Sequence, residues 1–178
     1  KVIVINLDKR TDRLEKISTQ LNNLGITFER FSAIDGQEKD ISPITAGTMS
    51  HQMVLEANYE NRILILEDDA YFVDDFNEKF AEVITYLPPD NDIFYLGALL
   101  PKHTGKVLDI GNKYWFKQVM TTGAHAYSIN PAKVKYFAEK LKGYEWYIDI
   151  GLREFATDYK AVVAQPNLVI QYLSLIHI

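Results

Sequence analysis

The stretch from residue 61 to residue 73 reads NRILILEDDAYFV. Its aliphatic run, residues 63–66, is typical of a strand that is buried on both faces of a parallel sheet. The acids Glu67, Asp68 and Asp69 follow this run without a spacer. Adjacent carboxylates repel one another, so this placement costs stability unless a cation, a helix N-terminus or hydrogen bonds compensate. The sequence therefore predicts a core strand that ends in a charged site.

This acidic cluster has two interpretations. In open α/β sheets, ligands bind outside the carboxyl ends of the strands, and oxygen ligands suit a hard divalent ion that is held jointly with substrate phosphates. The other interpretation is a plain turn whose charges favour the N-terminus of the next helix, which Asp74 and Asp75 would open. A short acidic cluster is a weak motif, so the local sequence leaves both interpretations open.

Composition narrows the class of protein. The chain has 178 residues, of which 47% are hydrophobic and 24% are charged, and this mixture fits one domain over residues 1–178. A net charge of −5 without a long basic run argues against nucleic acid as a partner. The absence of cysteine excludes disulfides and thiolate zinc sites. No run approaches the roughly 18 apolar residues of a membrane span. The start at Lys1, in a strand and without an initiator Met, is consistent with a fragment of a longer product.

Hydrophobic periodicity predicts a mixed, mostly parallel sheet flanked by helices. The expected strands cover residues 2–7, 26–31, 63–66, 92–97, 124–129, 161–164 and 168–172, with a hairpin across residues 107–118. The expected helices cover residues 11–24, 76–87 and 131–142, and the chain closes with an apolar tail over residues 173–178.

A further helix is expected after a polar loop over residues 37–47. Ser42-Pro43 is one possible start, and Thr45 or Thr48 is the alternative cap. The apolar spacing places Met49, Met53, Val54 and Ala57 inward, and His51 in the first turn of this helix.

Several polar residues are expected at the same edge of the sheet as the acidic cluster. The loop after the first strand brings Arg10 and Arg13 there, where guanidinium groups suit a diphosphate, although both also fit a solvated helix start. Asp35 follows the second strand in an Asp-Gly turn. Thr11 is the expected cap of the helix that follows the arginines.

Four later candidates have equally plain structural alternatives. His51 and His125 fit either the lining of a site or the core of the domain. Gly123 permits a ligand to approach the backbone, or makes a turn. Asp149 stands between apolar neighbours, so it is either a helix cap or a functional carboxylate.

The order of the short motifs resembles glycosyltransferase family 25, which contains lipooligosaccharide and collagen galactosyltransferases. The likeness runs from about Val2 to Gln171. The motifs are VINLDKRxDR (4–13), FSAIDG (31–36), GxMSH (47–51), LILEDDA (64–70), GAHAY (123–127) and YID (147–149).

The resemblance implies a GT-A type, Rossmann-like fold and an inverting transfer of galactose or glucose from a UDP-sugar, assisted by Mn²⁺ or Mg²⁺. The acceptor would be a glycan, glycolipid or glycoprotein, as in lipopolysaccharide biosynthesis. The family's bacterial members act at the cytoplasmic face of the inner membrane, so a cytoplasmic or peripheral location is expected.

The resemblance also assigns roles to residues. It implies Glu67 and Asp69 as metal ligands, with Asp69 the direct one, and Asp149 as the general base. The residues implied to line the donor site are Asn6, Arg10, Arg13, Asp35, His51, Asp68, Gly123 and His125.

The chain departs from the family pattern at one place: the Ser-Asp-Ile element is absent, and residues 174–178 read SLIHI. The end of the domain is therefore expected to be truncated or altered. Two rival hypotheses follow. The first is a GT-A-like domain that binds nucleotide or glycan without catalysis. The second is a metal-dependent phosphoester hydrolase, which would consume its substrate without an acceptor.

Overall fold

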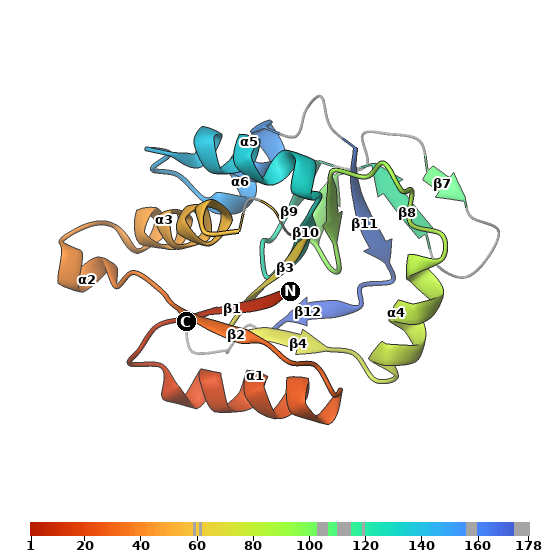
Figure 1. Ribbon diagram of the computed structural model, residues 1–178, viewed down its shortest axis with the longest axis horizontal. Coiled ribbons are helices and arrows are strands. Elements are labelled where there is room, and N and C mark those ends of the chain that lie inside the picture. The colour runs from red at the N-terminus through yellow and green to blue at the C-terminus, as the bar shows by residue number, and fades with distance from the viewer. Residues whose placement is uncertain are drawn as a thin grey trace.

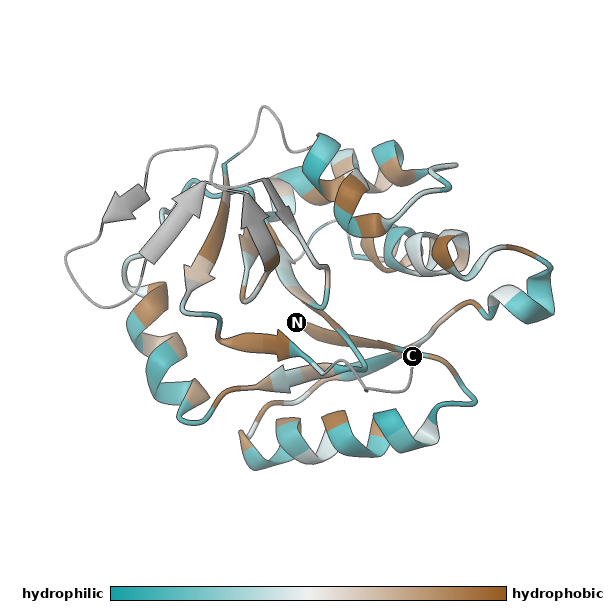
Figure 2. Ribbon diagram, turned by 180° about the vertical axis from the view of Figure 1, so that it is seen from behind, coloured by the Kyte–Doolittle hydropathy of each residue, from teal (hydrophilic) through white to brown (hydrophobic). Residues whose placement is uncertain are grey.

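The computed structural model is an α/β structure in which helices cover both faces of one central sheet (Figure 1). It describes residues 1–58, 60, 62–102, 107–109, 115–118, 120–155 and 160–172. Hydrophobic residues concentrate in the strands at the centre, and polar residues occupy the outer faces of the helices (Figure 2).

The central sheet has the strand order β2-β1-β3-β10-β5-β11-β8-β7. All of these strands run in one direction except β8 and β10, which pair antiparallel with both of their neighbours. The predicted mixed, mostly parallel sheet is therefore confirmed. The strands are β1 (Val2–Asn6), β2 (Glu29–Ser32), β3 (Ile63–Glu67), β5 (Ile93–Tyr95), β7 (Val107–Asp109), β8 (Trp115–Gln118), β10 (Ala126–Ile129) and β11 (Ala161–Gln165).

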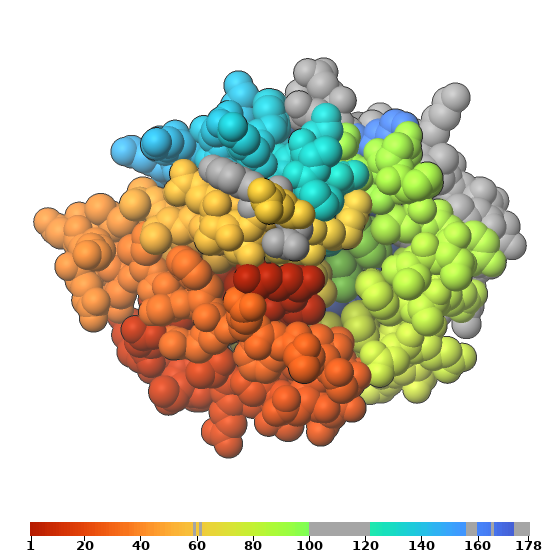
Figure 3. Space-filling model, viewed as in Figure 1, coloured from red at the N-terminus to blue at the C-terminus, as the bar shows by residue number. Residues whose placement is uncertain are grey.

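One face of the sheet is covered by α3 (Pro43–Glu56), α5 (Pro131–Leu141) and α6 (Ile148–Phe155) (Figures 1 and 3). The other face is covered by α1 (Thr11–Asn23), α4 (Phe76–Ile84) and a two-stranded ribbon of β4 (Ala70–Phe72) and β12 (Val169–Gln171). The remaining elements are α2 (Gly36–Lys39) and a second ribbon of β6 (Leu99–Lys102) and β9 (Met120–Thr122).

The strand β3 is buried on both faces, as its aliphatic run predicts. Ile63 and Ile65 belong to the core under α3 and α5, whereas Leu66 belongs to the core over α1. Successive side chains of a strand point to opposite faces of the sheet. Glu67 therefore continues toward α3 and Asp68 toward α1, so the acidic cluster is divided between the two faces.

The predicted inner face of α3 is wrong. Met49 and Met53 are 39% and 43% exposed, and Ala57 is exposed as well, while Val54 is buried as expected. The inner face instead carries buried polar side chains: Thr48, Ser50, His51 and Gln52. Buried polar groups are stable where hydrogen bonds satisfy them, and Ser50 Oγ donates to the Ala46 carbonyl at 2.8 Å. A search for apolar periodicity cannot find such a face.

Some helix starts also differ from expectation. The helix α3 begins at Ser42-Pro43, with Ser42 Oγ accepting from the Thr45 amide at 3.0 Å, so neither Thr45 nor Thr48 is its cap. Its earlier start places His51 beyond the first turn, and α2 occupies part of the predicted loop. Arg10, not Thr11, takes the N-cap position of α1, and no side chain caps that helix.

Other local predictions are confirmed. Asn130 Oδ1 accepts from the Ala132 amide at 3.1 Å at the start of α5. The strands β7 and β8 form the antiparallel pair of the predicted hairpin. The turn predicted for this hairpin at residues 111–112 lies outside the described residues, as does the C-terminal tail over residues 173–178. The described helices include none that is long and apolar enough to cross a membrane.

Candidate functional site

The candidate site lies where β1 and β3 end. Their parallel register aligns Ile5 with Glu67, so the loop after β1 and the acidic cluster after β3 come out at the same edge. This is the edge at which open α/β sheets bind ligands. The predicted residues Asn6, Arg13 and Asp68 are brought together here.

Asn6 is the centre of this group and is 1% exposed. Its Nδ2 donates to Asp68 Oδ2 at 2.8 Å and to the Arg10 carbonyl at 3.0 Å, while its Oδ1 accepts from Arg30 Nε at 2.9 Å. Arg13 Nη1 donates to the other oxygen of Asp68 at 2.9 Å. Both oxygens of Asp68 are therefore fixed, one by the last residue of β1 and the other by α1.

Asp69 is less well satisfied than its neighbour. Its Oδ2 accepts from Gln171 Nε2 at 3.2 Å and lies 3.6 Å from Arg13 Nη1. Its Oδ1 is buried and has no hydrogen-bond partner. Burial, together with the nearby charges of Glu67 and Asp68, raises the pKa of Asp69 to about 6. Gln171 and Arg13 thus compensate Oδ2 in part, while Oδ1 lacks a donor or cation.

Glu67 is held from the opposite face of the sheet. Its Oε1 lies 3.3 Å from His51 Nε2, and His51 Nδ1 lies 2.9 Å from the Tyr127 hydroxyl. Burial favours a higher pKa for Glu67, but the hydrogen bond and charge of His51, with His125 and Arg13, outweigh it and lower the pKa. A carboxylate only accepts, so in the neutral imidazole of His51 Nε2 donates to Glu67 and Nδ1 accepts from the Tyr127 hydroxyl.

His125 lies inside the domain. It is fully buried, and its Nε2 lies 3.2 Å from the Val169 carbonyl, so Nε2 carries the proton. Its Nδ1 has no partner, and burial lowers the pKa of this imidazole. The structure places His125 behind the acidic cluster, where it joins β10 to β12.

Asp149 is the second residue of α6, and its carboxylate binds two backbone amides. Its Oδ1 accepts from the Ile150 amide at 2.8 Å and its Oδ2 from the Gly123 amide at 2.9 Å. Gly123 has φ +100°, a conformation that L side chains rarely adopt. The arrangement fixes the chain before β10, and a role of Asp149 as general base stays a prediction.

Arg10 and Asp35 lie at the periphery of the site. Arg10 forms a two-bond pair with Asp12 at 2.9 and 2.8 Å. Asp35 caps α2 through the Gln37 amide and pairs with Lys9 Nζ at 2.5 Å. Neither side chain hydrogen-bonds to the acidic cluster, but the Arg10 carbonyl accepts from Asn6 and both residues line a pocket.

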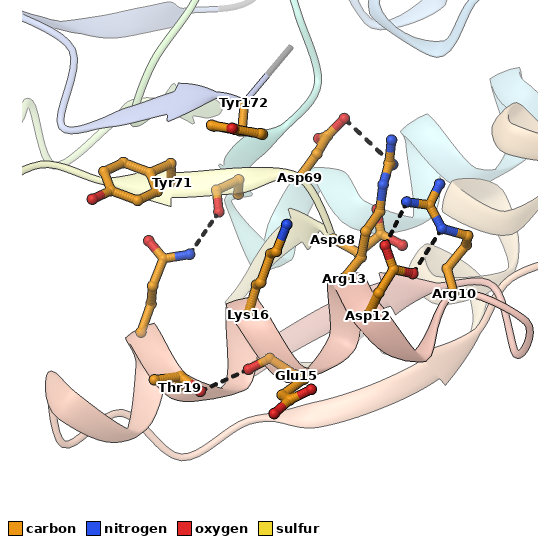
Figure 4. Close-up of a pocket in the computed structure, with 12 residues that line it drawn as sticks. Arg10, Asp12, Arg13, Glu15, Lys16, Thr19, Asp68, Asp69, Tyr71 and Tyr172 are labelled. Atoms are coloured by element: carbon orange, nitrogen blue, oxygen red, sulfur yellow. Dashed lines mark hydrogen bonds and ion pairs between the residues drawn. The ribbon is translucent and has the colours of Figure 1, made fainter. Parts of the chain in front are cut away.

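Two pockets meet at the acidic cluster. One of about 320 Å³ lies on the α3 side, and its lining includes Asp35, His51 and Glu67. The other, of about 670 Å³, lies between α1 and the β4–β12 ribbon (Figure 4). The residues that line both pockets are Arg10, Arg13, Asp68 and Asp69.

Some residues of the site could not be predicted from local sequence patterns. Tyr127 and Gln171 support Glu67 and Asp69 from β10 and β12. Tyr71 and Tyr172 line the larger pocket. The position of each residue at the site depends on which strands pair, and local sequence patterns do not determine that pairing. The alternation of side chains along a strand indicates only which residues share a face.

The site fits a divalent ion only in part. Within the described ranges, no three His, Asp or Glu side chains are placed to hold a metal ion together. Asp69 nevertheless offers a carboxylate whose partners do not satisfy it. Since Oδ1 is enclosed, an ion would reach this side chain through Oδ2 or after a rotation. The residues thus suit an ion that is shared with a bound ligand.

Comparison with known proteins agrees with the motif resemblance. A sequence model of glycosyltransferase family 25, described as LPS biosynthesis protein, matches residues 1–47. A protein of Acanthamoeba polyphaga mimivirus that is named as a glycosyltransferase, R655, is 25% identical over 166 residues, which cover 81% of this chain and 48% of the relative. A glycosyltransferase 25 family member of Aedes aegypti is 28% identical over 110 residues, covering 47% of this chain and 18% of the relative.

The fold has a solved counterpart. A glycosyltransferase involved in glycosylation of the major capsid of PBCV-1 matches with a TM-score of 0.60 at 9% identity, covering 97% of this chain and 94% of that one. At this identity the match concerns the fold alone. The chain spans about half the length of its mimivirus relative.

Proposed function

From the premise that these matches support assignment to glycosyltransferase family 25, we propose that the chain transfers galactose or glucose from a UDP-sugar to a glycan or glycoprotein acceptor, with inversion. The observation that carries the proposal is the incompletely satisfied Asp69 beside Arg13, between two pockets. A diphosphate that departs there gains negative charge, which a cation and a guanidinium stabilise.

The donor lies in the smaller pocket in this proposal. Asp35, His51 and Glu67 supply polar groups on its walls, and Arg10 and Arg13 form its border with the larger pocket. Arg13 already binds Asp68, so it can exchange part of that contact for a phosphate oxygen. Mn²⁺ or Mg²⁺ would be held by Asp69, with Glu67 nearby and the remaining ligands from the diphosphate and water.

The acceptor hydroxyl needs a base, and Asp149 is our candidate. Both of its oxygens accept one backbone N–H, and each carboxylate oxygen can accept a further bond. The lipopolysaccharide context is proposed from the family description alone.

Calorimetric titration of UDP, with and without Mn²⁺, tests the proposal. We expect binding to wild type that requires Mn²⁺ and is lost in Asp69→Asn. The matched control is Asp74→Asn, because Asp74 is an exposed acid of the next turn and lines neither pocket. Equal UDP binding by wild type and Asp69→Asn, or no binding by wild type, would overturn the metal-dependent donor site.

Consumption of the donor separates the remaining alternatives. A transferase releases UDP from the UDP-sugar faster when an acceptor is present. A binding domain without catalysis would bind UDP but release none from UDP-sugar, and a phosphoester hydrolase would consume its substrate at a rate independent of the acceptor.

A further inference from the structure

The larger pocket is not explained by the donor site. Its volume of about 670 Å³ lies on the α1 side of the sheet, opposite His51 and Glu67. One wall comes from α1 and the other from the β4–β12 ribbon (Figure 4). A donor in the smaller pocket would leave this space free for a second ligand.

The ribbon presents two exposed tyrosine rings to this pocket. Tyr71 is 46% exposed and Tyr172 is 59% exposed, and both line it. Tyr71 pairs with Ile170 across the ribbon, so alternate residues, which include Tyr172, point away from the core. Figure 4 shows the two rings near each other, above α1. Large aromatic side chains that stay exposed beside a pocket commonly mark a surface that binds a ligand.

The opposite wall carries unused hydrogen-bonding groups. Within the described residues, the Glu15 carboxylate and the Lys16 ammonium form no ion pair or hydrogen bond, although the Glu15 carbonyl accepts from Thr19 Oγ1 at 2.8 Å. Lys16 Nζ lies over the Tyr172 ring, 5.8 Å from its centre. By contrast, Arg10 and Asp12 bind each other. Figure 4 shows Lys16 pointing from α1 toward Tyr172, where its ammonium can donate to hydroxyl groups, whereas the Glu15 carboxylate points away from the tyrosines.

The charge of the lining favours a neutral ligand. Its acids, Asp12, Glu15, Asp68 and Asp69, balance or exceed its bases, Arg10, Arg13 and Lys16. A polyanion would therefore gain little here. A pyranose ring has an apolar face that suits a tyrosine ring, and hydroxyl groups at its rim that suit Lys16.

We infer that this pocket binds a pyranose ring of the acceptor glycan, with Tyr71 and Tyr172 against its apolar face and α1 side chains at its hydroxyl groups. Arg13, Asp68 and Asp69 line both pockets, so this ring lies beside the donor site. It is a ring of the acceptor other than the one that is glycosylated, because Asp149, the candidate base, belongs to α6 on the opposite face of the sheet and lines neither pocket. The inference rests on the proposed function and adds that the acceptor is a glycan, since the tyrosine surface recognises a sugar ring.

Saturation-transfer NMR with the methyl β-pyranosides of galactose, glucose and mannose tests this inference. The samples contain wild-type protein, with and without saturating UDP and Mn²⁺. We expect saturation transfer to the ring protons of at least one pyranoside, and a loss of affinity of about tenfold in Tyr71→Ala and in Tyr172→Ala. Tyr172→Trp should retain binding because it keeps an aromatic face.

Ile170→Ala is the matched control. Ile170 is 43% exposed on the same outer face of the ribbon but does not line the pocket, so its loss should leave the saturation transfer unchanged. The inference is overturned if no pyranoside responds, or if the tyrosine variants respond as wild type does. UDP titration of the same variants keeps the two proposals apart. Intact UDP binding with no sugar response refutes only the acceptor pocket, and sugar binding without UDP binding refutes only the donor site.

Discussion

Asn6 and Asp68 are joined by a 2.8 Å hydrogen bond across 62 residues of sequence, from the end of β1 to the turn after β3. The amide suits this position because Nδ2 can donate to a carboxylate while Oδ1 accepts from Arg30. A carboxylate at position 6 would repel Asp68. The hydrogen bond therefore connects the first loop of the site to the acidic cluster.

Asn6→Ala should lower the free energy of unfolding by about 1–3 kcal/mol, because it leaves Asp68 Oδ2 and Arg30 Nε without their partner in a partly buried place. Urea unfolding at pH 7 measures this change. Asn22→Ala, on the exposed side of α1, should change stability by no more than about 0.5 kcal/mol. Equal effects of the two substitutions would show that the Asn6 contacts do not stabilise the site.

Tyr127→Phe should also destabilise the protein, by about 1–3 kcal/mol, since it removes the donor to His51 Nδ1 in a fully buried place. Nitrogen NMR of the imidazole gives an independent measure. We expect the proton of wild-type His51 on Nε2, facing Glu67, and a mixture of tautomers in the variant. The control is Tyr147→Phe, whose ring is 46% exposed. An unchanged tautomer in Tyr127→Phe would contradict the role of the hydroxyl.

The strong local signals predicted most of the fold. The aliphatic run of β3 and the Asn130-Pro131 start of α5 both appear as expected. The inner face of α3 does not, because Thr48 and Ser50 are buried through hydrogen bonds to backbone carbonyls, Thr48 to that of Trp146 before α6 and Ser50 to that of Ala46 in its own helix. Propensity describes a residue alone, whereas such burial depends on its partners.

Only part of the site could be predicted, because local sequence patterns do not contain contacts between distant residues. Glu67, Asp68 and Asp69 are adjacent in sequence, so their position at the end of a strand predicts a common edge. Their supports are not adjacent: Gln171 reaches Asp69 through the β4–β12 pairing, which links residues about 100 positions apart. No local pattern encodes that pairing, and the larger pocket depends on it.

A close approach of β12 to the sheet makes Gly97 irreplaceable. A Cβ at this position would lie 1.8 Å from the Val169 carbonyl oxygen, so Gly97→Ala must displace backbone. We expect a loss of about 3 kcal/mol or more, or failure to fold. Gly47→Ala is the control, because nothing lies within 4 Å of its added Cβ inside α3, and it should stabilise by about 0.5–1 kcal/mol. Thermal unfolding measures the stability of both variants. A Gly97→Ala protein that is destabilised by less than about 1 kcal/mol would contradict the close contact between Gly97 and Val169.

Asp69 should make stability fall as the pH rises. Its pKa is about 6 in the folded protein, against an ordinary value of 3.8, so the folded state binds the proton more tightly. The tighter proton binding stabilises the folded state fully below pH 3.8, and this stabilisation is lost as the pH rises through 6. At about 1.36 kcal/mol per pKa unit, the difference is roughly 3 kcal/mol. The lowered pKa of Glu67 has the opposite effect. Its ionised form stabilises the folded protein, and this stabilisation declines only as the pH falls below 4.5, the ordinary pKa of a glutamate.

Asp69→Asn removes this titration and isolates its effect. In metal-free buffer, we expect the variant to be more stable than wild type by roughly 3 kcal/mol at pH 7, and the difference to shrink as the pH falls toward 4.5. Urea unfolding of both proteins across this range, with chelator present, measures it. Saturating Mn²⁺ and UDP should reverse the order at pH 7, since a ligand that binds only the folded wild type stabilises it. If the difference in unfolding free energy between the two proteins did not change with pH, the charge of the buried Asp69 would not be what destabilises the wild type.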